Sequence, residues 1–212
     1  MKKDIVVLFS GGVDSVAAAL YYIIKGLSVH LLTFDNGAES HLEKSENKAK
    51  ELKLKYPEAL VWSLGNSQRL FQKLALKNLE KDVKKYGNLI CCGCKMAMLA
   101  EALIYCRKNK IKFIADGFRK EQGYYPEQTR GYMDVASELA ESFGVKYEHP
   151  VYNVKLSGIK KLIKKAGISA VPSQASCLFA FNRVTNDMIW EYTALKAKAV
   201  KKYVKGKSGG QK

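Results

Sequence analysis

Short apolar runs alternate with longer amphipathic stretches along most of the chain. The run at 5–9 is rich in β-branched and aromatic residues and is continuous, which is typical of a strand buried on both faces. The other strands are expected at 28–34, 59–64, 112–115 and 146–149. The helices are expected at 16–24, 40–55, 66–86, 91–109, 132–143, 157–166 and 185–204.

Alternation of this kind predicts an α/β fold. We expect a doubly wound, mostly parallel five-stranded sheet with helices on both faces, plus a C-terminal helical extension. The predicted organisation is one catalytic domain over 1–182, a helix over 183–204 and a disordered basic tail over 205–212. Ligands in such sheets bind outside the carboxyl ends of the strands.

The first predicted strand ends in Ser10-Gly11-Gly12-Val13-Asp14-Ser15, and an Ala-rich helix follows directly. The glycines allow a tight turn and a close approach of the backbone to a ligand. The start of the helix adds unpaired N–H groups and a positive dipole end, which suit a phosphate. We expect Ser10 and Ser15 to donate further hydrogen bonds, and Asp14 to hold a Mg²⁺ ion between phosphates. The loop differs from the Walker type because no lysine closes it.

Basic residues outnumber acidic ones by 36 to 20, which gives a net charge of +16. This charge predicts a polyanionic partner, and nucleic acid is the first candidate. A solvated lysine surface is the alternative, since only five of the basic residues are arginines, one of them Arg183. No apolar run of 18 residues and no leader pattern are visible, so we expect a cytoplasmic protein without membrane spans.

Three cysteines form the second candidate site. Cys91 and Cys94 make a C-x-x-C pair at a predicted helix start, where thiol pKa values are lowered, and Cys177 lies in a later loop. Three thiolates can hold an iron–sulfur cluster with one open iron, or zinc with a fourth ligand such as Cys92; catalytic thiols without metal are a further alternative. Cys106, in mid-helix, is expected to be a buried apolar residue.

Ser10 to Ser15 resembles the S-G-G-x-D-S loop of ATP pyrophosphatases, the PP-loop enzymes. More of the chain, roughly 1–182, resembles the catalytic domain of tRNA 4-thiouridine synthetases. The matching stretches are Cys91-x-x-Cys94-Lys95-x-x-Met98, Asp116-Gly117 with Gln122 and Gln128-Thr129, His149-Pro150 with Lys155, and Cys177-Leu178-Phe179. Met96, Val154 and Ser176 depart from the family's pattern, and two extra residues precede Gln128-Thr129.

This resemblance implies an ATP-dependent tRNA sulfur transferase that adenylates a uridine carbonyl and replaces its oxygen with sulfur. Asp14, Cys94 and Cys177 would be catalytic, and Cys91, Cys94 and Cys177 would hold a [4Fe–4S] cluster, with zinc as the lesser candidate. ATP would contact the residues Ser10, Gly11, Gly12, Asp14, Ser15, Phe34, Asp35, Gly117 and Gln122. Arg119 and Lys120 are candidates for phosphate contacts or for solvated loop charges.

The implied partners are tRNA and either sulfide or a sulfur-donor protein. The sequence contains no counterpart of that family's RNA-binding region, so its own lysines or a separate RNA-binding subunit would bind the tRNA. A homodimer is left open. Two other functions are also left open: a PP-loop sulfur transferase or ligase acting on a small molecule, and a non-catalytic nucleotide- or cluster-binding subunit.

Overall fold

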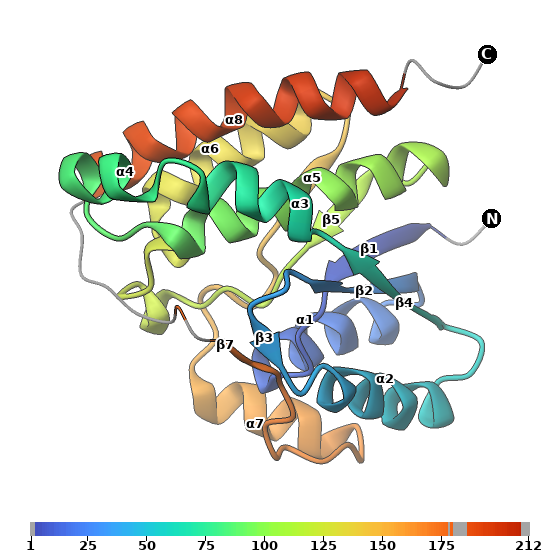
Figure 1. Cartoon of the computed structure of the whole chain (residues 1–212). Helices are drawn as coiled ribbons and strands as arrows, with labels where there is room; N and C mark the ends of the chain where they lie inside the picture. Colours follow the sequence, from blue (N-terminus) through green and yellow to red (C-terminus); the bar gives the residue numbers. More distant parts are fainter. Residues whose placement is uncertain (1–2, 178, 180–185, 209–212) are drawn as a thin grey trace.

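A five-stranded sheet forms the centre of the computed structural model, which describes residues 3–177, 179 and 186–208 (Figure 1). Its strand order is β4-β2-β1-β5-β6, and every pairing within it is parallel. The strands are β1 (Asp4–Leu8), β2 (Ser28–Asp35), β4 (Leu60–Asn66), β5 (Phe113–Ala115) and β6 (Lys146–Glu148). The predicted α/β class with a five-stranded parallel sheet is confirmed.

Strand β1 shows why the apolar runs are continuous. Ile5 and Val7 point into one core, and Val6 and Leu8 point into another on the opposite face. Successive side chains of a strand alternate between faces, so a strand covered by helices on both sides needs apolar residues at every position.

Helices cover both faces of the sheet, as predicted (Figure 1). One core contains side chains of α1 (Val13–Ile24), α2 (Glu43–Lys55) and α7 (Leu156–Lys165). The opposite core is built on α5 (Ile90–Lys108) and α6 (Arg130–Glu141), and α8 (Asn186–Ser208) lies over both.

Helix α8 is integrated into the fold and is not a loose extension. It buries Tyr192, Val200 and Val204, and its Lys196 Nζ lies 2.5 Å from Asp82 Oδ2 on α4 (Leu79–Tyr86). The helix also runs to Ser208, so the first residues of the tail that we expected to be disordered are helical. The domain boundary at 182/183, Leu178 and residues 209–212 lie outside the described residues.

The helix predicted over 66–86 is wrong as a single element. The chain there forms α3 (Gln68–Phe71), a π-helical turn (Gln72–Leu76) and α4. The π-turn packs closely on α5: a Cβ added at Gly93 of α5 would lie only 2.8 Å from the Cβ of Ala75. Local propensity cannot anticipate a contact of this kind.

A second, two-stranded sheet was not predicted. Strand β3 (Glu39–Ser40) pairs antiparallel with β7 (Ser176–Cys177), so α2 begins at Glu43 and not at residue 40. Between β5 and α6 the chain forms two 3₁₀ turns, η2 (Lys120–Gln122) and η3 (Pro126–Gln128).

No single helix in the described ranges is long and apolar enough to cross a membrane. Within those ranges, α4 and α5 taken together meet that length and composition, but they are bent by 118° to each other.

The chain leaves β1 toward β2 on one side of the sheet and returns to β5 on the other. The carboxyl ends of β1 and β5 therefore flank a topological switch point, where open α/β sheets form a crevice.

Candidate active site

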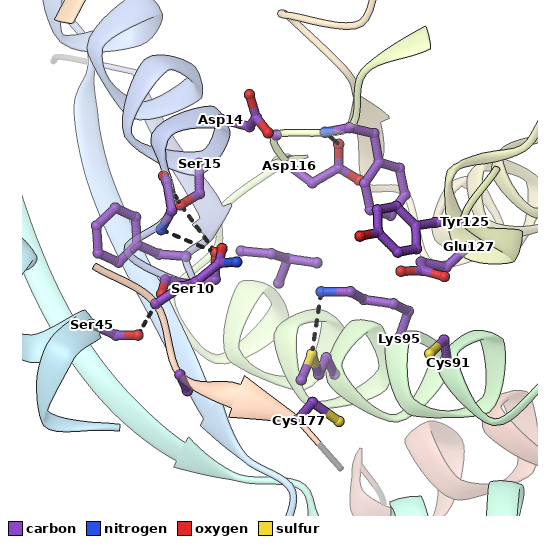
Figure 2. Close-up of a pocket in the computed structure, with 18 of the residues that line it drawn as sticks. Ser10, Asp14, Ser15, Ser45, Cys91, Lys95, Asp116, Tyr125, Glu127 and Cys177 are labelled. Carbon is purple, nitrogen blue, oxygen red and sulfur yellow. Dashed lines mark hydrogen bonds between the residues drawn. The ribbon is translucent and has the colours of Figure 1, made fainter. Parts of the chain in front are cut away.

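A cavity of about 700 Å³ lies at the carboxyl ends of β1, β2 and β5. Its walls come from the glycine loop after β1, one face of α5, the loop after β5 and the segment around β7 (Figure 2). Elements far apart in sequence therefore contribute to one site, at the place that the sheet order predicts.

The glycine loop turns two hydroxyls toward the cavity. Ser15 Oγ donates to Gly12 O at 2.9 Å, and Ser10 Oγ lies 3.3 Å from both Ser15 Oγ and Gly12 N. Among the described residues, no side-chain cap hydrogen bond is formed at the start of α1, so the first N–H groups of the helix are available to an anion. Gly11 has a φ of +77°, and a Cβ there would lie 2.1 Å from the carbonyl oxygen of Ser173. This geometry suits a bound phosphate.

Asp14, the predicted Mg²⁺ ligand, is instead engaged by protein groups. Its Oδ1 lies 2.6 Å from Nε of Arg119, and its Oδ2 accepts from Gln122 Nε2 at 3.1 Å. Burial raises the pKa of Asp14, and Arg119 and Gln122 only partly offset it. The carboxylate therefore does not fit the Mg²⁺ role as it lies. Arg119 is buried and also contacts Glu121, so it is not a surface group for RNA phosphates.

The loop after β5 is fixed against the glycine loop. A Cβ added at Gly117 would lie 2.5 Å from the carbonyl carbon of Asp14, so only glycine allows this approach. Asp116 accepts hydrogen bonds from Tyr147 Oη at 2.5 Å and His149 Nδ1 at 2.9 Å. These contacts place Gly117 and Gln122 beside the glycine loop. Sequence reasoning did not foresee that His149 would bind Asp116 in this way.

The end of β2 supplies Phe34 but not Asp35 to the cavity wall. The Asp35 carboxylate accepts from Gly37 N and from Gln68 Nε2, both at 2.7 Å. Asn36 lines the cavity in its place, and its Nδ2 donates to Cys94 Sγ at 3.2 Å. The expected nucleoside contact of Asp35 thus has no support in this geometry.

The three predicted cysteines line the same cavity. Cys91 and Cys94 lie on α5 at a spacing of three, so they share one helix face, which Lys95 also presents to the cavity. Cys177 arrives from β7, where it pairs with Glu39 of β3. Cys92 and Cys106 lie in the core and outside the cavity wall.

The donor set suits a soft metal in kind, because thiolates bind iron and zinc. Its arrangement does not fit: within the described part of the chain, no three His, Cys, Asp or Glu side chains are placed to hold a metal ion. Burial also raises the pKa of Cys94 to about 12, which overturns the expected lowering by the helix start.

Among the ionisable residues of the cavity that sequence reasoning missed are Lys95, Glu39 and Glu127. Burial raises the pKa of both glutamates, and the charge of Lys95 partly counters it. Glu127 is buried, and its Oε2 has no hydrogen-bond partner within the part of the chain that the structure describes. Burial lowers the pKa of Lys95, but Cys94 and the surrounding carboxylates outweigh it and the pKa is raised. The available signals for Lys95 were its place directly after the C-x-x-C pair and its spacing of four residues from Cys91, which puts both on the same helix face.

A Ser-Gly-Gly-x-Asp-Ser turn between the first strand and first helix of this sheet defines the class: a PP-loop ATP pyrophosphatase. Residues 4–183 match the family model described as queuosine biosynthesis protein QueC. The chain belongs to that family.

Two solved structures share the fold. One is described as a predicted subunit of tRNA methyltransferase from Methanocaldococcus jannaschii; identity is 20%, the TM-score is 0.55, and 83% of each chain is covered. The other is the U34-tRNA thiolase NcsA from Methanococcus maripaludis with its [4Fe–4S] cluster; identity is 15%, the TM-score is 0.56, and 100% of this chain and 74% of that chain are covered. The comparison with curated proteins gave no match.

Proposed function

We propose that this protein is an ATP-dependent transferase that adenylates an oxygen atom of its acceptor and then replaces that oxygen with sulfur. The observation that carries the proposal is that Cys91, Cys94 and Cys177 share one cavity with the glycine loop. ATP activation and thiol chemistry can therefore act on one bound acceptor.

The first step forms a bond between the acceptor oxygen and the α-phosphorus and breaks the bond from that phosphorus to pyrophosphate, which leaves. The loop N–H groups and the hydroxyls of Ser10 and Ser15 stabilise the charge that develops on the phosphates. Adenylation turns a poor leaving group into AMP. Sulfide then forms the carbon–sulfur bond as AMP departs with the acceptor oxygen. If the outer sulfur of a cysteine persulfide is the nucleophile instead, a second cysteine thiolate attacks the persulfide cysteine's sulfur, which breaks the S–S bond, releases the thiolated product and leaves the two cysteines as a disulfide.

The acceptor that we favour is a uridine in tRNA. The net charge of +16 supports a polyanionic partner, and the descriptions of both structural neighbours name tRNA. The chain's own lysines or a separate RNA-binding subunit would hold the tRNA. The cluster of the NcsA structure supports iron at the three cysteines, which would have to move closer together to hold it.

A small-molecule acceptor is the second candidate. It is favoured by the family model, whose description names queuosine biosynthesis and no transfer of sulfur. The same loop would then adenylate the small acceptor for a sulfur transfer or a ligation.

A cysteine-to-alanine series on anaerobically reconstituted protein tests the proposal. We expect Cys94→Ala and Cys177→Ala to lose thiolated nucleoside while retaining pyrophosphate release, and the core variant Cys106→Ala to retain both. Iron and zinc analysis of the same samples tests the metal. Full thiolation by Cys177→Ala would contradict the shared-cavity argument, and pyrophosphate release with small acceptors alone would favour the second candidate.

A further inference from the structure

Lys95 faces the cavity with carboxylates in its surroundings, but none of the described ones lies within ion-pair distance of its ammonium group. Lys95 leaves α5 on the face that also carries Cys91 and Cys94, and it points toward the centre of the cavity in Figure 2. Its Nζ forms no ion pair with any described residue, and its hydrogen-bond contact is with Met98 Sδ at 3.9 Å, a weak acceptor.

Two buried lysines elsewhere in the fold behave differently. Lys48 Nζ lies 2.7 Å from Glu51, and Lys196 Nζ lies 2.5 Å from Asp82. A charge that is removed from water is costly unless it is paired, so these pairs are the ordinary outcome. Lys95 is half-buried, and no ion pair within the described residues neutralises it, so its ammonium is open to an anion that binds in the cavity.

The place of Lys95 identifies which part of a nucleotide it would meet. The glycine loop and the start of α1 lie across the cavity from α5 (Figure 2). A pyrophosphate unit held at the loop leaves the third phosphate of ATP nearer the middle. Two other cations line the cavity, but Arg119 is tied to Asp14 and Lys160 is exposed on α7.

We propose that Lys95 binds the α-phosphoryl group of ATP and of the adenylated acceptor. This inference rests on the proposed function. As the acceptor oxygen bonds to the α-phosphorus and pyrophosphate departs, the ammonium stabilises the negative charge on the non-bridging oxygens. It does so again when AMP leaves. The glycine loop has no lysine of its own, and α5 supplies that charge from another part of the chain.

Two separable anion subsites follow from this assignment. Pyrophosphate affinity should depend on the loop, represented by Ser10, whereas AMP affinity should depend on Lys95. Isothermal titration calorimetry of the full chain with AMP, with pyrophosphate and with α,β-methylene ATP measures the three affinities directly. No acceptor needs to be known for this experiment.

Lys95→Met should weaken AMP binding by about tenfold to a hundredfold, the usual range for losing a hydrogen bond to a charged group. Its pyrophosphate affinity should stay close to that of the unchanged protein. Ser10→Ala should show the reverse pattern. Lys108→Met is the matched control, because it removes the same charge from an exposed position on the same helix. Lys95→Arg keeps the charge and should retain most of the AMP affinity.

AMP binding by Lys95→Met that equals the binding by Lys108→Met would overturn the assignment while leaving ATP binding at the loop intact. If Lys95→Met does not fold, judged by circular dichroism, Lys95→Gln replaces it and the same comparison decides. If the unchanged protein binds neither ATP nor pyrophosphate, the proposed function fails and the subsite falls with it.

Discussion

Removing the Asp14 carboxylate should destabilise the protein before any ligand is added. The Asp14→Ala change leaves Arg119 as a buried cation in the wall of the cavity. Side-chain exposures in the pair are 5% for Arg119 and 17% for Asp14, so neither charge is well hydrated. The change also removes the acceptor of Gln122, which connects the loop after β5 to α1.

The size of the effect follows from the burial of the pair. Removing one partner of a buried ion pair costs about 3–5 kcal/mol. Arg119 keeps its contact with Glu121, so we expect the lower limit, about 3 kcal/mol. For a chain of 212 residues this corresponds to a fall in Tm of roughly 6–12 °C. Ser10→Ala removes only weak contacts near 3.3 Å and should melt close to the unchanged protein.

Thermal unfolding followed by circular dichroism, without nucleotide, measures these differences. Asp134→Ala, at an exposed acidic position on α6, is the matched control for loss of a carboxylate. In the double variant with Arg119→Met, part of the lost stability should return because the unpaired cation is gone. If Asp14→Ala and Asp134→Ala have the same Tm, the ion pair contributes nothing to stability. The Asp14 carboxylate would then be free for another role, such as binding Mg²⁺.

Two further predictions concern pH and salt. Burial alone would lower the pKa of His149, but the carboxylate of Asp116 outweighs it and the pKa is raised. Protonated His149 thus stabilises the folded state below its unfolded pKa of about 6.5, and this stabilisation is lost as the pH rises through the higher folded value. Denaturant unfolding at several pH values should therefore show that the free energy of unfolding falls more steeply with rising pH for the unchanged protein than for His149→Gln. Parallel curves of this free energy against pH would contradict the prediction. We also expect the isolated chain to bind tRNA with a log–log salt slope of several units, measured by filter binding, because lysines displace counterions from phosphates. A flat salt response would move tRNA binding to a partner subunit.

The amino-acid sequence by itself determined the sheet, the helices on both faces and the phosphate-binding loop. These features are local: a strand buried on both faces needs a continuous apolar run, and a Gly-Gly turn before a helix needs only adjacent residues. The C-x-x-C spacing likewise placed Cys91 and Cys94 on one face of α5, since positions three apart on a helix are neighbours.

Only the tertiary structure decided how distant segments share the cavity. The β3–β7 pairing brings Cys177 into the cavity wall that also contains Cys94, which lies 83 residues earlier in the chain. Long-range packing also joined Arg119 to Asp14 and left Lys95 unpaired. Charges and thiols take their state from burial and from neighbours across the fold, and a linear pattern contains neither.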